Sequence, residues 1–272
     1  MQDAAAGDAA VPPQERVDDP FQQMALAPQP FPAVAETKVR DVPAMAMQNM
    51  TAIRGGEARS GACELRVSDN ELENAFFRLL FDEAGQLVSV WDKRRQREVL
   101  AAGRTGNEWR MFEDKPGMYN AWDLHETYED RPVEMAPRTT IEPGESGPLT
   151  VALRLKRTFQ SSRAEQVVRL CADIPRIDFE TWIDWRETER ILKVAFPLSV
   201  LSSCFTTDTS AGGLVRETHR NTTWQQARYE VCCHRWIDMS EGLFGVALLN
   251  DGKYGCDVRK NVMRLSLLKA PI

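Results

Sequence analysis

The chain has 272 residues, of which 43% are hydrophobic and 27% charged, and its formal net charge is −6. This is the composition of a globular protein long enough to bury a sizeable core. A mildly acidic chain without a basic stripe disfavours nucleic acid as a partner, and no apolar run approaches the roughly eighteen residues of a membrane-spanning helix.

The first part of the chain, residues 1–62, is rich in Ala, Pro, Gln and Asp. Prolines punctuate residues 27–34, which excludes a helix or a central strand there. We therefore expect an irregular, extended lead-in, partly linker or the remnant of a preceding region, followed by one domain over residues 63–272. The first residues lack the basic and apolar parts of a secretion signal, which predicts a cytoplasmic protein.

The cysteines and histidines do not form a local metal motif. No C-x-x-C pair occurs, and a long chain without a secretion signal favours reduced, mostly buried thiols over disulfides. No histidine has metal-ligand spacing to another, so only residues distant in sequence could assemble a zinc site. The residues concerned are Cys63, Cys171, Cys204, Cys232, Cys233 and Cys256, and His125, His219 and His234.

The first strands are expected just after residue 63. Residues 74–81 and 87–92 flank a turn at 82–86 and predict a β-hairpin. Phe77, Leu79 and Phe81 alternate with Phe76 and Leu80, so both faces of this strand carry apolar residues. The pattern predicts a central strand covered on both sides.

The rest of the chain also has the pattern of strands separated by turns. In residues 149–159, Val151, Leu153 and Leu155 share one face, and residues 165–185 predict two strands that turn near Pro175. Helical periodicity is weak and no fixed-length repeat is found. The fold class expected is all-β, a large antiparallel β-sandwich. Further strands are expected at 191–200, 213–219, 227–239, 243–250 and 262–268.

Three segments concentrate polar and aromatic side chains: residues 112–130, 216–230 and 234–242. Aromatic rings stack on the apolar faces of sugars, while carboxylates and amides bind hydroxyl groups, so a sugar site would explain them. A surface loop anchored by its aromatic residues would explain them equally well. If residues 229–238 formed one strand, alternate side chains would share a face and either line a groove or pair with arginines: Glu230, Cys232, His234, Trp236 and Asp238.

Five motifs in order resemble the C-terminal region of the class II α-mannosidases, glycoside hydrolase family 38, in its cytosolic and bacterial branch. The resemblance covers roughly residue 63 to the end. This sequence differs from the family pattern at Asn120, Glu217, Gln225 and Gly252. The motifs are Glu113–Asp123, Arg216–Gln225, His234–Glu241, Gly245–Gly255 and Met263–Pro271.

The resemblance implies a galactose-mutarotase-like supersandwich that would continue past the C-terminus of this chain. It also implies retaining hydrolysis of terminal α-mannosides by two carboxyl groups. In the family those groups, and a zinc ion held through an H-x-D motif, belong to a preceding barrel. We therefore expect this chain to support the fold and shape the sugar cleft, with no catalytic residue or cofactor of its own. Its partners would be a barrel, in cis or in trans, and an α-mannoside oligosaccharide.

The residues expected to bind substrate lie within these motifs. In the first motif the loop would reach toward the sugar, with a ring face offered by Trp122 and a hydrogen-bond acceptor by Asp123. A stand-alone carbohydrate-binding module without catalysis is the alternative, and a remnant without function is the third possibility. The nominated residues are Tyr119, Asn120, Trp122, Asp123, His219, Asn221, His234 and Asp238.

Overall fold

The computed structural model describes residues 65–271, which belong to a unit that begins at Thr51. These residues form nineteen β-strands in four sheets, and all strand pairs are antiparallel. The prediction of an all-β, antiparallel protein is confirmed. The expected lead-in over residues 1–62 and Cys63 lie outside the described residues. Within the described range, no helix is long and apolar enough to cross a membrane.

The first sheet contains the predicted hairpin. Its five strands pair in chain order, and the hairpin forms the third and fourth. Phe77, Leu79 and Phe81 are buried, whereas Arg78 is exposed and Leu80 is half-buried. The central position of this strand is thus confirmed, but the predicted cover on both sides is wrong, because only one face meets another sheet. The strands are β1 (Arg66–Val67), β2 (Glu71–Glu73), β3 (Phe77–Phe81), β4 (Leu87–Asp92) and β5 (Arg97–Glu98).

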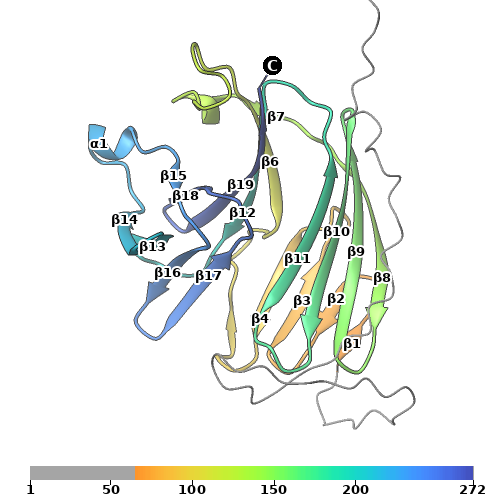
Figure 1. Ribbon diagram of the computed structural model, residues 1–272. Coiled ribbons are helices and arrows are strands. Elements are labelled where there is room, and N and C mark those ends of the chain that lie inside the picture. Colours follow the sequence, from red (N-terminus) through yellow and green to blue (C-terminus); the bar gives the residue numbers. More distant parts are fainter. Residues whose placement is uncertain (1–64, 272) are drawn as a thin grey trace, which may run out of the picture. The chain divides into compact units, whose positions relative to one another are not determined.

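The second sheet packs against the buried face of the first (Figure 1). Val151, Leu153 and Leu155 are buried on one face, as their spacing predicts, and share a hydrophobic core with Leu72 and Leu79. The turn near Pro175 is also confirmed. In the order β11-β10-β9-β8, the strands are β11 (Ile177–Asp184), β10 (Ser162–Cys171), β9 (Thr150–Phe159) and β8 (Arg138–Ser146).

The third sheet has six strands and two chemically different faces. One face contributes apolar side chains such as Met111, Leu192 and Leu265 to the core. The opposite face, which we call the polar face, carries Lys193 and Arg264. In the order β15-β18-β19-β12-β6-β7, the strands are β15 (Val231–Cys232), β18 (Gly255–Arg259), β19 (Val262–Ala270), β12 (Arg190–Pro197), β6 (Glu108–Glu113) and β7 (Pro132–Val133).

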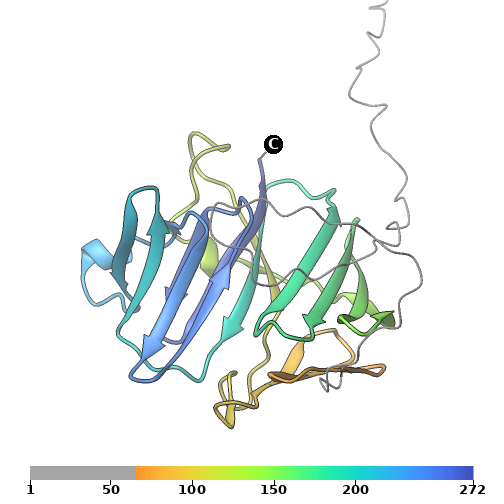
Figure 2. The same cartoon turned by 60° about the horizontal axis from the view of Figure 1, so that its bottom comes forward.

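The fourth sheet lies beside the six-stranded sheet (Figure 2). Its inner face adds Phe205, Ile237 and Met239 to the same core that contains the first two sheets. In the order β14-β13-β16-β17, its strands are β14 (Gly212–Glu217), β13 (Cys204–Thr209), β16 (Trp236–Glu241) and β17 (Phe244–Leu249).

The single strand expected over residues 227–239 is wrong. The chain leaves the six-stranded sheet after β15 and enters the four-stranded sheet at β16. Main-chain bonds fix this change of sheet: the N–H of Cys233 donates to Tyr254 O at 2.8 Å, and the N–H of His234 donates to Asp208 O at 2.9 Å. The five side chains expected on one face therefore do not share one: Cys232 lies on β15, Trp236 and Asp238 lie on β16, and Glu230 and His234 lie outside the strands.

The five cysteines among the described residues are all free, which agrees with the expected reduced thiols. Their expected burial holds in part. Cys233 and Cys256 are buried, Cys171 and Cys204 are half-buried, and Cys232 is exposed.

The core predicts a large difference between two leucine variants. Leu153 is 0% exposed, so Leu153→Ala should lower the free energy of unfolding by about 2–5 kcal/mol through lost burial and a new cavity. Leu243 is 92% exposed, and Leu243→Ala is the matched control with a change within about 0.5 kcal/mol. Urea unfolding of both variants measures this difference, and equal losses would contradict the assignment of the core.

Candidate functional site

Residues 114–127 form a loop between β6 and the short 3-10 helix η2 (Tyr128–Asp130), which we call the aromatic loop. At its tip the rings of Tyr119 and Trp122 are stacked, with centroids 6.1 Å apart and planes 21° apart. Tyr119 has a φ of 56°, and its carbonyl accepts from the N–H groups of Trp122 and Asp123, both at 2.8 Å. A tight turn therefore presents two rings that are 62% and 86% exposed.

The base of the aromatic loop is held firmly. Leu124 and Tyr128 are buried against Phe112, and the Tyr128 ring meets the Phe112 ring edge-on at 5.3 Å. The buried carboxylate of Asp114 accepts from the ammonium of Lys269. The loop is thus ordered at its base while its aromatic tip is exposed to solvent.

The other residues predicted in this loop have different surroundings. The side chain of Asp123 is exposed, and its backbone carbonyl accepts from Lys269 Nζ at 2.5 Å. Asn120 is half-buried, and within the described part of the chain its buried Oδ1 has no hydrogen-bond partner. His125 accepts from the N–H of Thr127 through Nδ1 at 3.2 Å, so this histidine shapes the loop.

Residues 218–230 form a second loop that contains α1 (Thr223–Gln226). Thr222 caps this helix: its hydroxyl accepts from the N–H of Gln225 at 3.3 Å, and the Gln225 side chain accepts from the N–H of Thr222 at 3.0 Å. The predicted residues His219 and Asn221 are both exposed. This segment is therefore a short, capped helix.

The two loops meet on the polar face of the six-stranded sheet. The hydroxyl of Tyr229 donates to Leu124 O at 2.8 Å, and a guanidinium nitrogen of Arg220 lies 3.4 Å from a carboxylate oxygen of Glu129. These contacts bring the first two groups of predicted site residues to one side of the sheet. Neither Tyr229 nor Arg220 was nominated from the sequence.

The remaining two predicted residues lie on β16 of the neighbouring four-stranded sheet and in the segment just before it. The His234 ring stacks on Tyr254 with centroids 5.6 Å apart, and Asp238 accepts from the hydroxyl of Ser240 at 2.8 Å. The structure therefore divides the eight nominated residues between two places.

A network of buried charges lies under the two loops. Lys193, which is 0% exposed, donates to Asp257 at 2.9 Å and to Glu230 at 2.8 Å. Arg264 donates through Nε to Asp257 at 2.7 Å and also contacts Glu129. The network connects β12, β18 and β19 to η2, so it holds the base of the aromatic loop on the sheet.

Sequence reasoning missed this network, although a signal exists. Lys193 and Arg264 each stand between two apolar neighbours inside a strand, and a charge that becomes buried there requires a buried partner. The partner Asp257 is 64 residues away from Lys193, which is why the pattern of either segment alone does not reveal the pair.

The pKa shifts in the network indicate a structural role. Burial alone would lower the pKa of the Lys193 ammonium, but Asp257 and Glu230 outweigh burial and raise that pKa above its ordinary value. Burial raises the pKa of the Tyr128 phenol, whose ring lies 5.0 Å from Lys193 Nζ. Lys193 is therefore charged and Tyr128 neutral near pH 7, and neither is tuned for acid–base catalysis at that pH.

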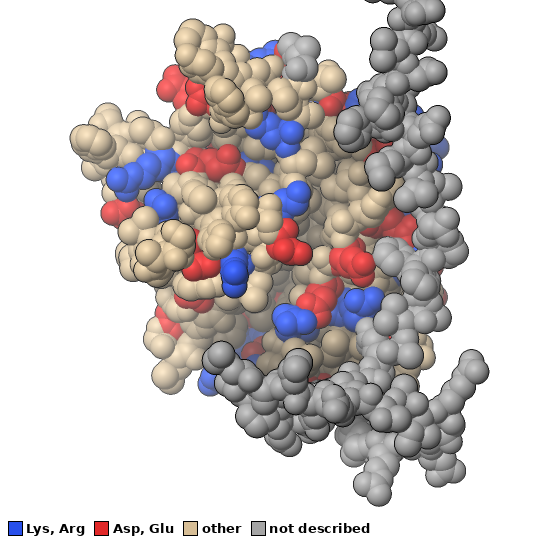
Figure 3. Space-filling view, in the orientation of Figure 1, with Lys and Arg blue, Asp and Glu red and all other residues tan. Residues whose placement is uncertain are grey.

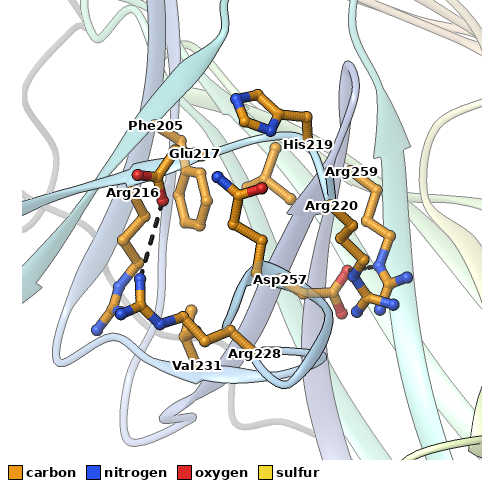
Figure 4. Close-up of a pocket in the computed structure, with 11 residues that line it drawn as sticks. Phe205, Arg216, Glu217, His219, Arg220, Arg228, Val231, Asp257 and Arg259 are labelled. Carbon is orange, nitrogen blue, oxygen red and sulfur yellow. Dashed lines mark ion pairs between the residues drawn. The ribbon is translucent and has the colours of Figure 1, made fainter. Parts of the chain in front are cut away.

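Two hollows flank the network. The larger is a groove of about 720 Å³, in the size range of small-molecule sites. It is lined by β6, by residues 132–137 and by the turn between β18 and β19. The smaller, the arginine pocket, has a volume of about 30 Å³ and lies between the second loop and β18 (Figure 4). Among the described residues in view, basic and acidic side chains alternate over the surface (Figure 3).

The chain resembles known proteins in both sequence and fold. A family model described as the glycosyl hydrolases family 38 C-terminal domain matches residues 72–272. Alpha-mannosidase 2C1 of Homo sapiens is 41% identical over 202 residues, which are 74% of this chain and 19% of that protein. Alpha-mannosidase G of Dictyostelium discoideum is 31% identical over 206 residues, again 74% and 19% of the two chains.

A solved structure supports the same fold. An alpha-mannosidase from Enterococcus faecalis V583 superposes with a TM-score of 0.65 at 15% identity, covering 76% of this chain and 27% of that one. This chain therefore spans about a fifth of the length of the curated relatives that it matches, 19% in each case.

The buried network predicts a strong effect for one isosteric substitution. Asp257→Asn should lower the free energy of unfolding by about 3–5 kcal/mol, because Lys193 and Arg264 would lose their shared carboxylate. Glu142→Gln is the control, since the pair Glu142–Lys156 has side chains that are 52% and 48% exposed and should contribute less than about 1 kcal/mol. Chemical denaturation of both variants gives the comparison, and similar losses would show that the network is not structural.

The raised pKa values predict loss of stability in alkali. The folded-state pKa values of Tyr128 and Lys193 lie above the ordinary values of 10.0 and 10.5. Above about pH 10 the unfolded chain releases these protons while the folded chain retains them, so the free energy of unfolding falls as pH rises. Measured between pH 8 and pH 11, the fall should be shallower in Tyr128→Phe; an identical slope would exclude the Tyr128 contribution.

Proposed function

Since the chain belongs to glycosyl hydrolase family 38 through its C-terminal domain, we propose that it forms the C-terminal segment of an α-mannosidase. The enzyme would hydrolyse terminal α-mannosides with retention of configuration. The observation that carries the proposal is the 41% identity to alpha-mannosidase 2C1, of which the matched part of this chain covers 19%. The proposal includes the finer fold class, a galactose-mutarotase-like supersandwich, and the prediction of a cytoplasmic location.

The catalytic groups of a retaining glycosidase are two carboxyl groups about 5–5.5 Å apart, one a nucleophile and the other an acid and base. In this proposal they belong to a barrel that works with this chain, in cis or in trans. The chain itself contributes the sheets that support the cleft and the loops that line it. Residues 63–272 are its domain in this proposal.

Zinc is the cofactor that the family implies, and the described residues do not fit it. They contain no group of three or more His, Cys, Asp and Glu that could hold a metal. His125 bonds within the aromatic loop and His234 stacks on Tyr254. In this proposal zinc therefore belongs to the barrel.

The aromatic loop is the part of this chain that we assign to the sugar. The stacked rings of Tyr119 and Trp122 offer an apolar face to a pyranose, and the exposed carboxylate of Asp123 can accept from a hydroxyl. Asn120 in the same loop has a buried acceptor atom without a protein partner among the described residues. His219 and Asn221 lie on the adjoining second loop and extend the same surface.

His234 and Asp238 require a separate assignment. Asp238 lies on the four-stranded sheet, where Trp236 shares its outer face, and His234 lies just before β16. In this proposal they form a second carbohydrate contact.

A stand-alone carbohydrate-binding module is the alternative. The exposure of Tyr119 and Trp122 favours it, because such rings would bind sugar without any catalytic group. The two proposals differ in what the isolated chain does and in what a barrel adds.

Mannosidase assays distinguish the two proposals. The chain is expressed alone and together with the barrel of a family 38 relative, and hydrolysis of 4-nitrophenyl α-mannoside is measured. We expect no hydrolysis by the chain and activity only when both parts are present. Hydrolysis by the chain alone, or a barrel equally active without it, would contradict the proposal. Retention of mannosides by the isolated chain, with no effect on the barrel, would support the binding module.

One substitution tests the aromatic tip. Because Trp122 is 86% exposed, Trp122→Ala should leave the free energy of unfolding unchanged and lower kcat/KM of the reunited enzyme by up to about tenfold. Trp182→Ala is the control, since Trp182 is 45% exposed on β11 of a different sheet. Equal kcat/KM for the two variants would remove Trp122 from the sugar site.

A further inference from the structure

The arginine pocket contains more positive than negative charge. Four arginines line it: Arg216 from β14, Arg220 and Arg228 from the second loop, and Arg259 from β18. The carboxylates in its lining are Glu217 and Asp257. In Figure 4 the side chains of Arg216 and Arg228 extend to one end of the pocket, and Arg220 and Arg259 lie near Asp257.

The carboxylates in the lining are only partly available to these arginines. Asp257 already pairs with Lys193 and Arg264 in the buried network. Glu217 lies 3.9 Å from Arg228, at the outer limit of an ion pair. Asp257 is therefore shared among several cations, and Glu217 is a weak partner.

The excess of positive charge remains when the ion-pair partners outside the pocket lining are also counted. Outside the lining, Arg220 and Arg259 share one carboxylate, that of Glu129. Among residues 65–271 the set has six cations and four carboxylates: Lys193, Arg216, Arg220, Arg228, Arg259 and Arg264 against Glu129, Glu217, Glu230 and Asp257.

The pocket also has fewer hydrogen-bond acceptors than its buried donors require. The buried Nη2 of Arg220 and Nε of Arg259 have no hydrogen-bond acceptor among residues 65–271. Arg216 makes no ion pair within that range, and its Nε donates to the hydroxyl of Thr207 at 3.2 Å. The guanidinium groups of Arg220 and Arg259 both contact Glu129, and Arg259 Nε lies 3.7 Å from Asp257, beyond hydrogen-bond distance. Buried donors without acceptors are costly, so the two buried nitrogens would be stabilised by a further acceptor.

We propose that the arginine pocket binds a phosphate group. A phosphate monoester or inorganic phosphate carries close to two negative charges above its second pKa of about 6, which matches the excess of two cations. Planar guanidinium groups bind phosphate oxygens through paired hydrogen bonds. The phosphate could be free or carried by a sugar. The pocket adjoins the proposed sugar surface through His219, but phosphate binding does not depend on the mannosidase proposal.

Calorimetric titration of the full chain at pH 7.5 tests the site. The probes are inorganic phosphate, mannose 6-phosphate and mannose, with sodium chloride at equal ionic strength as the control. We expect saturable binding of the phosphates and no comparable binding of chloride. Tighter binding of mannose 6-phosphate would identify a sugar phosphate as the ligand, and equal binding would identify the phosphate group alone. No binding of either phosphate would overturn the proposal.

Variants locate the bound phosphate. Arg228 is 54% exposed, so Arg228→Gln should keep the fold and weaken phosphate binding roughly tenfold. Arg220→Lys keeps the charge but removes the guanidinium fork, and a similar loss is expected. The control is Arg163→Gln, because Arg163 is 59% exposed on β10 of another sheet. Wild-type affinity in the folded Arg228→Gln protein would overturn the assignment to this pocket.

Discussion

The buried contact between Lys193 and Asp257 is the interaction on which the polar face depends. An ammonium group without water is tolerated only where carboxylates surround it, and Asp257 supplies one of these while also accepting from Arg264. Through Arg264 the same group of charges reaches Glu129 in the segment that follows the aromatic loop. Sheet and loop are therefore parts of one electrostatic unit, and a change in one is expected to affect the other.

This arrangement explains how an exposed aromatic tip can be ordered. Two large rings in water have little packing to hold them: Tyr119 and Trp122 stack on each other but are largely exposed. The base of the loop holds the tip in place: the ion pair of Asp114 with Lys269 fixes one end, and the buried Tyr128 fixes the other. A binding surface of this kind is positioned in advance, so less conformational entropy is lost when a ligand docks.

Much of the fold could be predicted from local patterns, and the site only in part. Alternation identified the β3–β4 hairpin and the buried face of β9, because burial on one face determines every second residue. The division of residues 227–239 between two sheets could not be read this way, since it depends on Asp208 and Tyr254 in other strands. The local clustering of aromatic and polar residues indicated Trp122 and Tyr119. Tyr229 and Arg220 join the two loops through partners distant in sequence, so local patterns could not reveal them.

The position of β19 has a consequence for how the protein is made. This strand follows all the others of its sheet in sequence, yet it lies inside the sheet, between β18 and β12. Its Arg264 contacts Glu129, 135 residues earlier, so β6 and β12 leave the ribosome well before the strand and the charges that complete them. Until β19 is synthesised, Lys193 and an open sheet edge remain uncovered in the nascent chain. We therefore expect this sheet to fold late, and the unpaired edge to favour aggregation before it does.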